Sequence, residues 1–440
     1  PTCTPTRTTL LTGRLPARSH MLEPKIVPPE GTGLHGDEVT IAELLKKAGY
    51  NTAHIGKWHQ GDIEQAMPTN QGFDTASYPL HNQATFNFMH SEGEEDGFAD
   101  NVAVRETEPN YRMDKNFRPA GWVLGVDAVA GEEAHEWGVE AGKPLDYAYY
   151  DALNEHYKTL AIEKLNDLAA KDEPFFLNYW PQIPVNFTRR NRTFKTANGG
   201  TWVESMNDLD THLGDLFAAL EETGEADNTV LVVMSDNGPM MQAMPLSGYS
   251  QMVFRGFKGD TTEGGIRVNA YVRWPNVIQA DTFVGDIVHA SDWYTTLAVI
   301  AQAEQYIPRD RVVDGLNQTS LLFNGDGYSR RDYHFVYEGP HLNATIKEQF
   351  KAHWPAPGSP GFALPVFDLY RDLKETKPLM AAGMWSVAYF PDMRARHMAL
   401  KKKFPDRKEA FFEPYGGIAN LRPETLELLE YYHAARKAEE

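Results

Sequence analysis

Cysteine is almost absent from this chain, which has a single one, Cys3, in 440 residues. One cysteine excludes an intramolecular disulfide framework and leaves both the cytoplasm and the periplasm open as compartments. Basic residues are also scarce, because 42 lysines and arginines face 61 aspartates and glutamates, for a net charge of −19. This balance argues against a nucleic-acid or anionic-membrane surface, although it leaves room for a local basic pocket.

Long apolar runs are missing as well. No stretch reaches the roughly 18 apolar residues of a membrane span, and no secretory signal is visible at the start. Because the chain opens inside a motif, we expect an N-terminal piece to be missing, and a periplasmic or secreted location if that piece carries a signal. With 42% hydrophobic residues the chain can bury a substantial core, and its length predicts two or three structural units.

The head of the chain has the features of a helix start. Thr4 can cap a helix, Pro5 suits the first helical position, and Gly13 predicts a left-handed stop. Cys3 then lies just before a helix N-terminus, where the positive end of the dipole favours an anion, with Arg7 one turn into the helix. This setting argues against a buried, inert cysteine.

The string Cys-Thr-Pro-Thr-Arg at residues 3–7, followed by Leu-Thr-Gly-Arg, closely resembles the signature of type I sulfatases. In that family the cysteine is oxidised to formylglycine, so the resemblance implies a formylglycine-generating enzyme as a maturation partner. One hydroxyl of the aldehyde hydrate attacks, and the other expels the bound group by regenerating the aldehyde. A tyrosine phosphatase would need Cys-x5-Arg, whereas Arg7 lies four positions after Cys3. An unmodified structural cysteine remains the alternative.

A second motif follows a predicted helix and strand. Thr40 and Glu43 form the pattern of a capping box, and residues 51–55 predict a short strand. The loop after that strand reads Gly-Lys-Trp-His-Gln-Gly, at the end where α/β sheets place ligands. It resembles the second sulfatase signature, which implies that Lys57 and His59 contact the sulfate or the formylglycine hydrate. Taken alone, a lysine and a histidine on a loop are usually solvated surface groups.

A third motif follows the apolar run 229–234, which predicts a buried parallel strand. Asp236 and Asn237 come next, and a carboxylate beside an amide oxygen suits a hard cation, Ca²⁺ or Mg²⁺, rather than zinc. Asp-Asn-Gly is also an ordinary turn sequence. The resemblance implies that the pair binds metal together with the modified Cys3. Two further acidic ligands would lie in the missing N-terminal piece.

Residues 255–268 resemble the sulfatase stretch whose lysine reaches the sulfate group, which implies that role for Lys258. One departure concerns the histidine that sulfatases place after the strand predicted at 174–180, since no histidine occurs from 175 to 187. Gln182 follows that strand in the place of the histidine, but a neutral amide cannot act as a general acid. Three explanations stay open: Lys258 replaces the acid, another histidine enters from a variable segment, or the protein is slow or inactive.

Helical and strand patterns alternate through the rest of the first three quarters of the chain. Helices are predicted at about 147–170 and 202–222, and strands at 174–180, 229–234 and 270–274. Alternation of this kind predicts an α/β fold with a mostly parallel central sheet between helices. The resemblance adds that the fold is alkaline-phosphatase-like.

The sequence pattern changes in the last quarter of the chain. Short alternating strands at 333–338, 350–354 and 366–370 predict a smaller antiparallel subdomain, and residues 421–437 a terminal helix. We therefore expect a catalytic domain at 1–330, lacking its first strand, and a C-terminal subdomain at 331–440. Residues 67–144 show no sustained period, so they either overhang the pocket and select substrate or form a solvated insertion.

The four motifs in this order predict a sulfuric ester hydrolase that uses a formylglycine at Cys3 and a divalent cation. The alternatives are a formylglycine-dependent phosphodiesterase or phosphonate monoesterase, and a catalytically silent protein that binds sulfated glycans. Aryl, steroid and carbohydrate sulfates all remain possible substrates.

Overall fold

The computed structural model describes residues 1–25, 31–79, 125–137, 147–183, 201–239, 253–323, 327–355, 364–379, 387–408, and a few positions beyond them, namely 410–412, 418, 419, 421, 426, 430 and 434. The chain divides into two compact units, each assembled from separate stretches. The first unit consists of Pro1–Pro24, Asp37–Ala48 and Ala226–Glu409. The second unit consists of Lys25–Gly36, Gly49–Glu225 and Ala410–Glu440.

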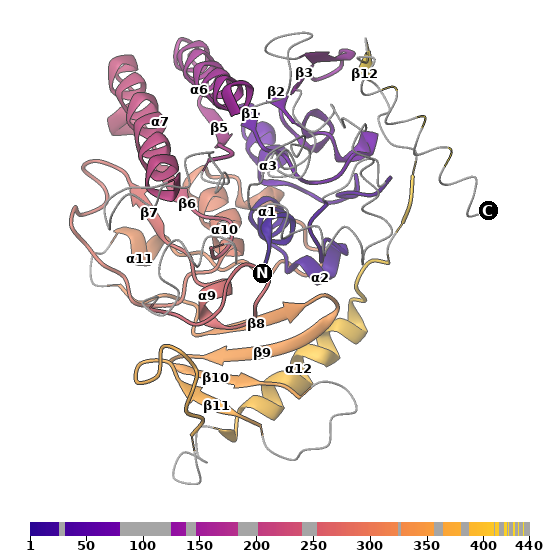
Figure 1. Ribbon diagram of the computed structural model, residues 1–440, viewed down its shortest axis with the longest axis vertical. Coiled ribbons are helices and arrows are strands. Elements are labelled where there is room, and N and C mark those ends of the chain that lie inside the picture. The colour runs from indigo at the N-terminus through magenta and orange to yellow at the C-terminus, as the bar shows by residue number, and fades with distance from the viewer. Residues whose placement is uncertain are drawn as a thin grey trace, which may run out of the picture. The chain divides into compact units, whose positions relative to one another are not determined.

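A six-stranded sheet forms the centre of the second unit (Figure 1). Its strands, in the order β12-β4-β3-β2-β1-β5, are β12 (Ile418–Ala419), β4 (Ala134–Trp137), β3 (Gly125–Val129), β2 (Thr75–Tyr78), β1 (Asn51–Gly56) and β5 (Phe175–Trp180). β1 runs parallel to β2 and β5, and β12 runs parallel to β4. Only β3 runs antiparallel to its two neighbours. The described sheet is thus mixed and mostly parallel, as the sequence predicted.

Helix α6 (Tyr147–Ala169) covers β1 and β5 and lies beside α7 (Thr201–Thr223) (Figure 1). Four of its residues, at four-residue spacing, form the buried stripe Leu153, Tyr157, Ala161 and Leu165. This spacing keeps the apolar side chains on one face of the helix. Next to this stripe, Lys158 Nζ donates to Asp215 Oδ2 of α7 at 2.8 Å. The unit also has the 3₁₀ turns η1 (Glu64–Ala66) and η2 (Pro68–Gln71).

The first unit holds the remaining described helices. These are α1 (Cys3–Thr12), α2 (Pro16–Ser19), α3 (Ile41–Lys47), α9 (Glu263–Ile266), α10 (Ala290–Ile300), α11 (Thr319–Phe323) and α12 (Phe390–Lys403), with the 3₁₀ turns η6 (Ala226–Asn228) and η9 (Glu304–Tyr306). The predicted capping box of α3 is confirmed, since Glu43 N–H donates to Thr40 Oγ1 at 3.2 Å and Thr40 N–H to Glu43 Oε2 at 2.7 Å.

Helix α1 begins earlier than the sequence predicted. Thr2 is its N-cap and Cys3 its first residue, so the prediction of a cap at Thr4 is wrong by two positions. Proline is tolerated anywhere in the first turn, because N–H groups there have no partner within the helix, and Pro5 therefore did not mark the exact start. The predicted stop at Gly13 is confirmed by its φ of 68°. A Cβ at Gly13 would lie 2.5 Å from the ring of Tyr294 on α10, so only glycine permits this contact.

Strands β6 (Leu231–Met234) and β7 (Ala270–Arg273) form a two-stranded antiparallel sheet in the first unit. The sequence predicted a buried parallel strand at 229–234, whereas β6 is half-buried and, among the described residues, pairs only with antiparallel β7. A short apolar run indicates a strand but does not specify its partner, which explains the error. The loop after β6 carries Asp236 and Asn237.

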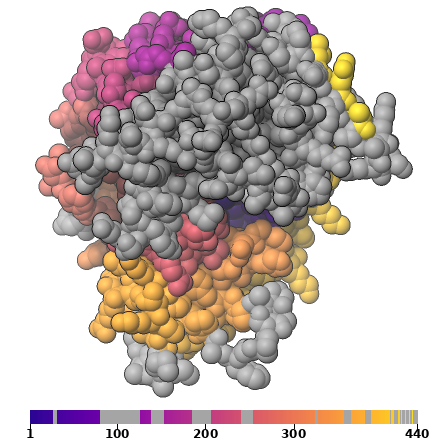
Figure 2. Space-filling view, viewed as in Figure 1, coloured from indigo at the N-terminus to yellow at the C-terminus, as the bar shows by residue number. Residues whose placement is uncertain are grey.

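The predicted antiparallel sheet of the last quarter is present, in the strand order β11-β10-β9-β8. Its strands are β8 (Tyr333–Glu338), β9 (His341–Lys347), β10 (Phe350–His353) and β11 (Val366–Asp368). Phe350 and Val366 form an apolar cluster with Phe390 at the start of α12. Figure 2 shows part of the outer surface of this C-terminal part of the chain in orange to yellow. Strand β9 was not predicted.

Several predictions fall on residues that the structure does not describe. Most of the segment without period at 67–144, namely 80–124 and 138–144, lies outside the described residues, as does most of the predicted terminal helix at 421–437. The described remainder of that segment contains β2, β3 and β4, which the sequence analysis missed. Among the described helices, none is both long and apolar enough to cross a membrane.

Candidate active site

Cys3 lies in the first turn of α1, where it is 2% exposed. Its thiol donates a hydrogen bond to Asn237 Oδ1, 3.0 Å from Sγ, in the loop after β6. The two residues are 234 positions apart in sequence, so tertiary structure alone brings them together. The helix N-terminus adds a fixed positive partial charge beside Cys3, which favours an anionic group there.

Arg7, one turn further along α1, is 8% exposed and bonds the neighbouring residue of the same loop. Its Nε and Nη2 both donate to Asp236 Oδ2, at 3.0 and 2.8 Å. Hydrogen bonds between two charged groups are stronger than neutral ones, and the planar guanidinium fixes their direction. This pair therefore ties α1 to the loop after β6 and holds a buried positive charge near Cys3.

Lys258 reaches the same place from the loop before α9. Its backbone N–H donates to Pro239 O at 2.7 Å, and the next N–H, of Gly259, to Pro1 O at 2.9 Å. Burial acts to lower the pKa of Lys258, but the charges of Cys3, when it is ionised, and of Asp236 outweigh it and raise this pKa above its usual value. The first unit thus brings five of the predicted site residues together: Cys3, Arg7, Asp236, Asn237 and Lys258.

Lys57 and His59 belong to the second unit, at the carboxyl end of β1. Both are buried, at 3% and 1% exposure, so they are not the solvated surface groups that such a loop usually carries. The chain turns at Gly56, whose φ is 94° and where a Cβ would lie 2.3 Å from Trp180 O. His59 also has a left-handed φ, 61°, which is uncommon for a residue with a side chain and occurs often at functional sites.

Gln182 lies beside this loop. β1 and β5 are parallel neighbours with Gly56 opposite Trp180, and Lys57 N–H donates to Trp180 O at 2.9 Å. Gln182 follows two residues after Trp180 and is 2% exposed. A buried amide, rather than a histidine, therefore occupies the end of β5 next to the loop that carries Lys57 and His59.

Sequence reasoning missed His54, a fully buried residue of β1 that supports the same loop. Its Nε2 lies 3.0 Å from Gly56 O, and its Nδ1 lies 3.0 Å from the side-chain nitrogen of Asn178 on β5. A carbonyl only accepts and an amide NH₂ only donates, so these partners assign a neutral ring protonated on Nε2. A histidine between Ala53 and Ile55 in the predicted strand, directly before a motif, was the available signal.

Asp236 and Asn237 fit part of a site for a hard cation. A carboxylate and an amide oxygen are the donors that Ca²⁺ and Mg²⁺ prefer, and Ca²⁺ takes about six to eight oxygen ligands. The two side chains supply part of such a set, and both already point toward Cys3 or Arg7. No cluster of three or more histidine, cysteine, aspartate or glutamate side chains suited to a metal occurs in the described part of the chain.

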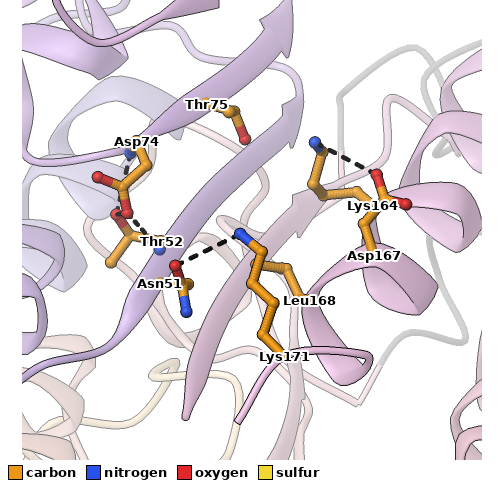
Figure 3. Close-up of a pocket in the computed structure, with 8 residues that line it drawn as sticks. All are labelled: Asn51, Thr52, Asp74, Thr75, Lys164, Asp167, Leu168 and Lys171. Carbon is orange, nitrogen blue, oxygen red and sulfur yellow. Dashed lines mark hydrogen bonds and ion pairs between the residues drawn. The ribbon is translucent and has the colours of Figure 1, made fainter. Parts of the chain in front are cut away.

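One cavity of about 280 Å³ lies elsewhere in the second unit, at the amino ends of β1 and β2 (Figure 3). In Figure 3, Lys171 extends toward Asn51 and bonds its Oδ1 at 3.4 Å, while Asp74 turns back to Thr52. Lys57 and His59 follow the carboxyl end of β1, so this cavity does not include them.

The family model described as sulfatase matches residues 1–303. The steryl-sulfatase of Rattus norvegicus is 29% identical over 452 aligned positions, which cover 86% of this chain and 77% of the relative. Arylsulfatase A of Homo sapiens is 30% identical, over 81% of this chain and 66% of the relative. The crystal structure of PsFucS1 sulfatase from Pseudoalteromonas sp. matches with a TM-score of 0.78 at 26% identity, over 93% of this chain and 82% of that one. These matches, with the six-stranded sheet and the separate antiparallel sheet β11-β10-β9-β8, confirm the predicted alkaline-phosphatase-like α/β fold.

Proposed function

Because this chain belongs to the sulfatase family, we propose that it hydrolyses a sulfate ester through a formylglycine formed at Cys3. The observation that supports this most directly is the convergence of Arg7, Lys258, Asp236 and Asn237 on Cys3 in the first unit. Once modified, position 3 would supply a geminal diol whose hydroxyl is the nucleophile. The formylglycine-generating enzyme remains a predicted maturation partner.

The side chains around Cys3 match the charge of a sulfate group. A tetrahedral sulfate carries its negative charge on oxygens, and positive groups in a site of low exposure stabilise such charge far better than they do in water. Arg7 is 8% exposed, and Lys258 brings a second positive charge, with Cys3 and Asp236 as its neighbours. By their motif, we assign Lys57 and His59 to contacts with the sulfate or the hydrate.

Asp236 would have two roles in this proposal. It orients Arg7 through both hydrogen bonds at Oδ2, and, as the neighbour of Asn237, which bonds Cys3, it would take a proton at position 3. With Asn237, and with the modified residue 3 as a third ligand, it would hold Ca²⁺, or Mg²⁺ in its place. Such an ion would supply positive charge and lower the pKa of a hydroxyl bound to it.

The leaving alcohol needs a proton source, and Gln182 cannot provide one. We assign that role to Lys258, which interacts with Cys3 and which, like any lysine with a pKa of about 10.4, is protonated at neutral pH. A group with so high a pKa is a weak acid, so this assignment favours substrates with good leaving groups, such as aryl sulfates. The missing histidine also keeps a silent, glycan-binding protein as the second candidate.

Mass spectrometry of the Cys3 peptide tests the proposal first, on protein produced together with a formylglycine-generating enzyme. We expect an aldehyde at position 3 and hydrolysis of an aryl sulfate that a Cys3→Ala variant lacks. An intact thiol under these conditions would remove the proposed chemistry. An aldehyde together with tight binding of a sulfated sugar but no hydrolysis would instead establish the binding protein.

A parallel assay separates the two reaction classes. Sulfate monoesters and phosphodiesters each carry one negative charge and similar tetrahedral geometry, so the same cations can serve both. We expect kcat/KM to be higher for an aryl sulfate than for an aryl phosphodiester. The reverse order would indicate a phosphodiesterase or phosphonate monoesterase. The domain boundary near residue 330 and a periplasmic or secreted location remain predictions.

A further inference from the structure

A buried charge cluster supports the loop that carries Lys258. Its centre is Lys351 on β10, which is 0% exposed and lies outside every predicted site motif. The ammonium of Lys351 donates to Glu263 Oε1 at 3.0 Å and to Glu375 Oε1 at 3.2 Å. Removing an ammonium from water is costly, so it is found buried only with such anionic partners.

Glu263 connects this cluster to the loop that carries Lys258. It is the first residue of α9, five positions after Lys258, and is 2% exposed. Its backbone N–H donates to Glu375 Oε1 at 2.7 Å, and its Oε2 accepts from Arg267 Nε at 2.9 Å. The main chain and the side chain of Glu263 are therefore both fixed by the cluster.

Glu375 is fixed in an uncommon backbone conformation. It has a φ of 50°, in the left-handed region, although it is 1% exposed and is not glycine. His353 Nε2 lies 2.5 Å from its Oε2. Burial acts to raise the pKa of Glu375, but the hydrogen bond to His353 and the charge of Lys351 outweigh it and keep this pKa below its usual value. Left-handed backbone of this kind persists where surrounding contacts determine it.

Hydrogen bonds within the loop connect Glu263 to Lys258. Thr262 Oγ1 and Gly264 N–H both donate to Arg255 O, at 2.8 and 2.7 Å. Phe257 N–H donates to Asp260 Oδ2 at 3.0 Å. These bonds close the segment 255–265 on itself, so a shift at Glu263 moves the whole loop rather than one residue.

We propose that Lys351 and Glu375 are positioning residues, which hold the Lys258 loop at the distance from Cys3 that the reaction requires. The C-terminal sheet would then contribute to the active site without contacting substrate. The effect on turnover rests on the proposed function, whereas the effect on the loop itself does not.

The test replaces Lys351 with methionine, which keeps most of the length of the side chain and removes the charge. Its matched control is Lys347→Met on the neighbouring strand β9, where a partly exposed lysine pairs with Asp332. Hydrogen exchange is measured by mass spectrometry for residues 253–267 and, as an internal reference, for α10. We expect exchange in the loop of Lys351→Met to be faster by about tenfold or more, with α10 unchanged. The control should exchange as the wild type does.

Turnover is the second readout. The kcat for an aryl sulfate should fall in Lys351→Met and stay unchanged in Lys347→Met, at a temperature where circular dichroism shows each variant folded. If Lys351→Met does not fold, Glu375→Gln removes one charge while keeping a hydrogen-bond acceptor, and the same two readouts apply. Unchanged exchange in the loop, or equal acceleration in the loop and α10, would overturn the proposal. A wild-type protein without turnover would refute the proposed function but leave the exchange result valid.

Discussion

Replacing Arg7 with lysine keeps the positive charge at the site but removes the planar group that orients it. This variant therefore shows how much of the activity depends on orientation rather than on charge alone. Arg7 donates two hydrogen bonds to Asp236 Oδ2, whereas the ammonium of lysine is a point charge on a flexible stem and cannot reproduce the planar fork. A hydrogen bond to a charged group contributes about 1.5–3 kcal/mol. Because the Asp236 side chain is 22% exposed, solvent screening places the loss near the lower end, at about 1.5–2 kcal/mol.

At about 1.4 kcal/mol for each factor of ten, this loss predicts a decrease in kcat/KM of roughly 10- to 30-fold for an aryl sulfate. Net charge in the site is unchanged, so substrate binding at low salt should weaken less than kcat does. The assay combines steady-state kinetics with thermal unfolding, because a loss of stability must be distinguished from a loss of transition-state contacts.

Arg18→Lys is the matched control. Arg18 makes the same kind of fork to Asp314, with Nε and Nη2 at 2.7 and 2.8 Å from the carboxylate oxygens, and it is 3% exposed. Its substitution should lower the unfolding temperature at least as much as Arg7→Lys but leave kcat/KM of the folded protein unchanged. The reasoning fails if both variants lose the same activity, or if Arg7→Lys loses none.

Three further outcomes are expected. Chelation of divalent ions should abolish turnover, and Asp236→Asn should require more Ca²⁺ for recovery than the wild type, as a titration would show. Burial lowers the pKa of His397 to about 4 from 6.5, so protonation of this side chain favours the unfolded chain. The stability that depends on a neutral His397 is therefore complete above pH 6.5 and is lost as pH falls toward 4. Denaturant unfolding should show this loss as roughly 3 kcal/mol that is absent in His397→Gln. Finally, Gln182→His should restore a general acid and raise the turnover of an alkyl sulfate, a poor leaving group, by up to about 100-fold.

The sequence predicted best those elements whose buried faces repeat regularly. The observed bounds of β1, β5, α6 and α7 lie within one or two residues of the predicted ranges. In α6 the buried residues repeat along one face, and in β1 five of six residues are buried. Strand β9 was missed even though Leu342, Ala344 and Ile346 alternate with more polar residues and are buried. Its period of two was the correct signal.

The pairings in the site could not be read from the sequence. Arg7 and Asp236 are 229 positions apart, and neither local pattern specifies the other as its partner. Asp-Asn-Gly was compatible with a plain turn until Asn237 was found at Cys3. Lys351 and Glu375 carried no signal at all, since a lysine in a short strand is normally assigned to the solvent-facing side.

The chain is acidic, and yet its proposed substrate is an anion. The two are compatible because the field of the net charge is screened with distance, whereas the cations at Cys3 act on the substrate at contact. The net charge of −19 is spread over a 440-residue surface, and at physiological salt its field is screened beyond about 8 Å. The cations at Cys3 act at contact instead, where one charge pair at 4 Å contributes about 4 kcal/mol at an effective dielectric constant of 20. Selection for an anion therefore depends on where Arg7 and Lys258 are held, and much less on net charge. This dependence explains why carboxylates, Asp236 directly and Glu263 and Glu375 through the loop, fix cations in place at a site meant for an anion.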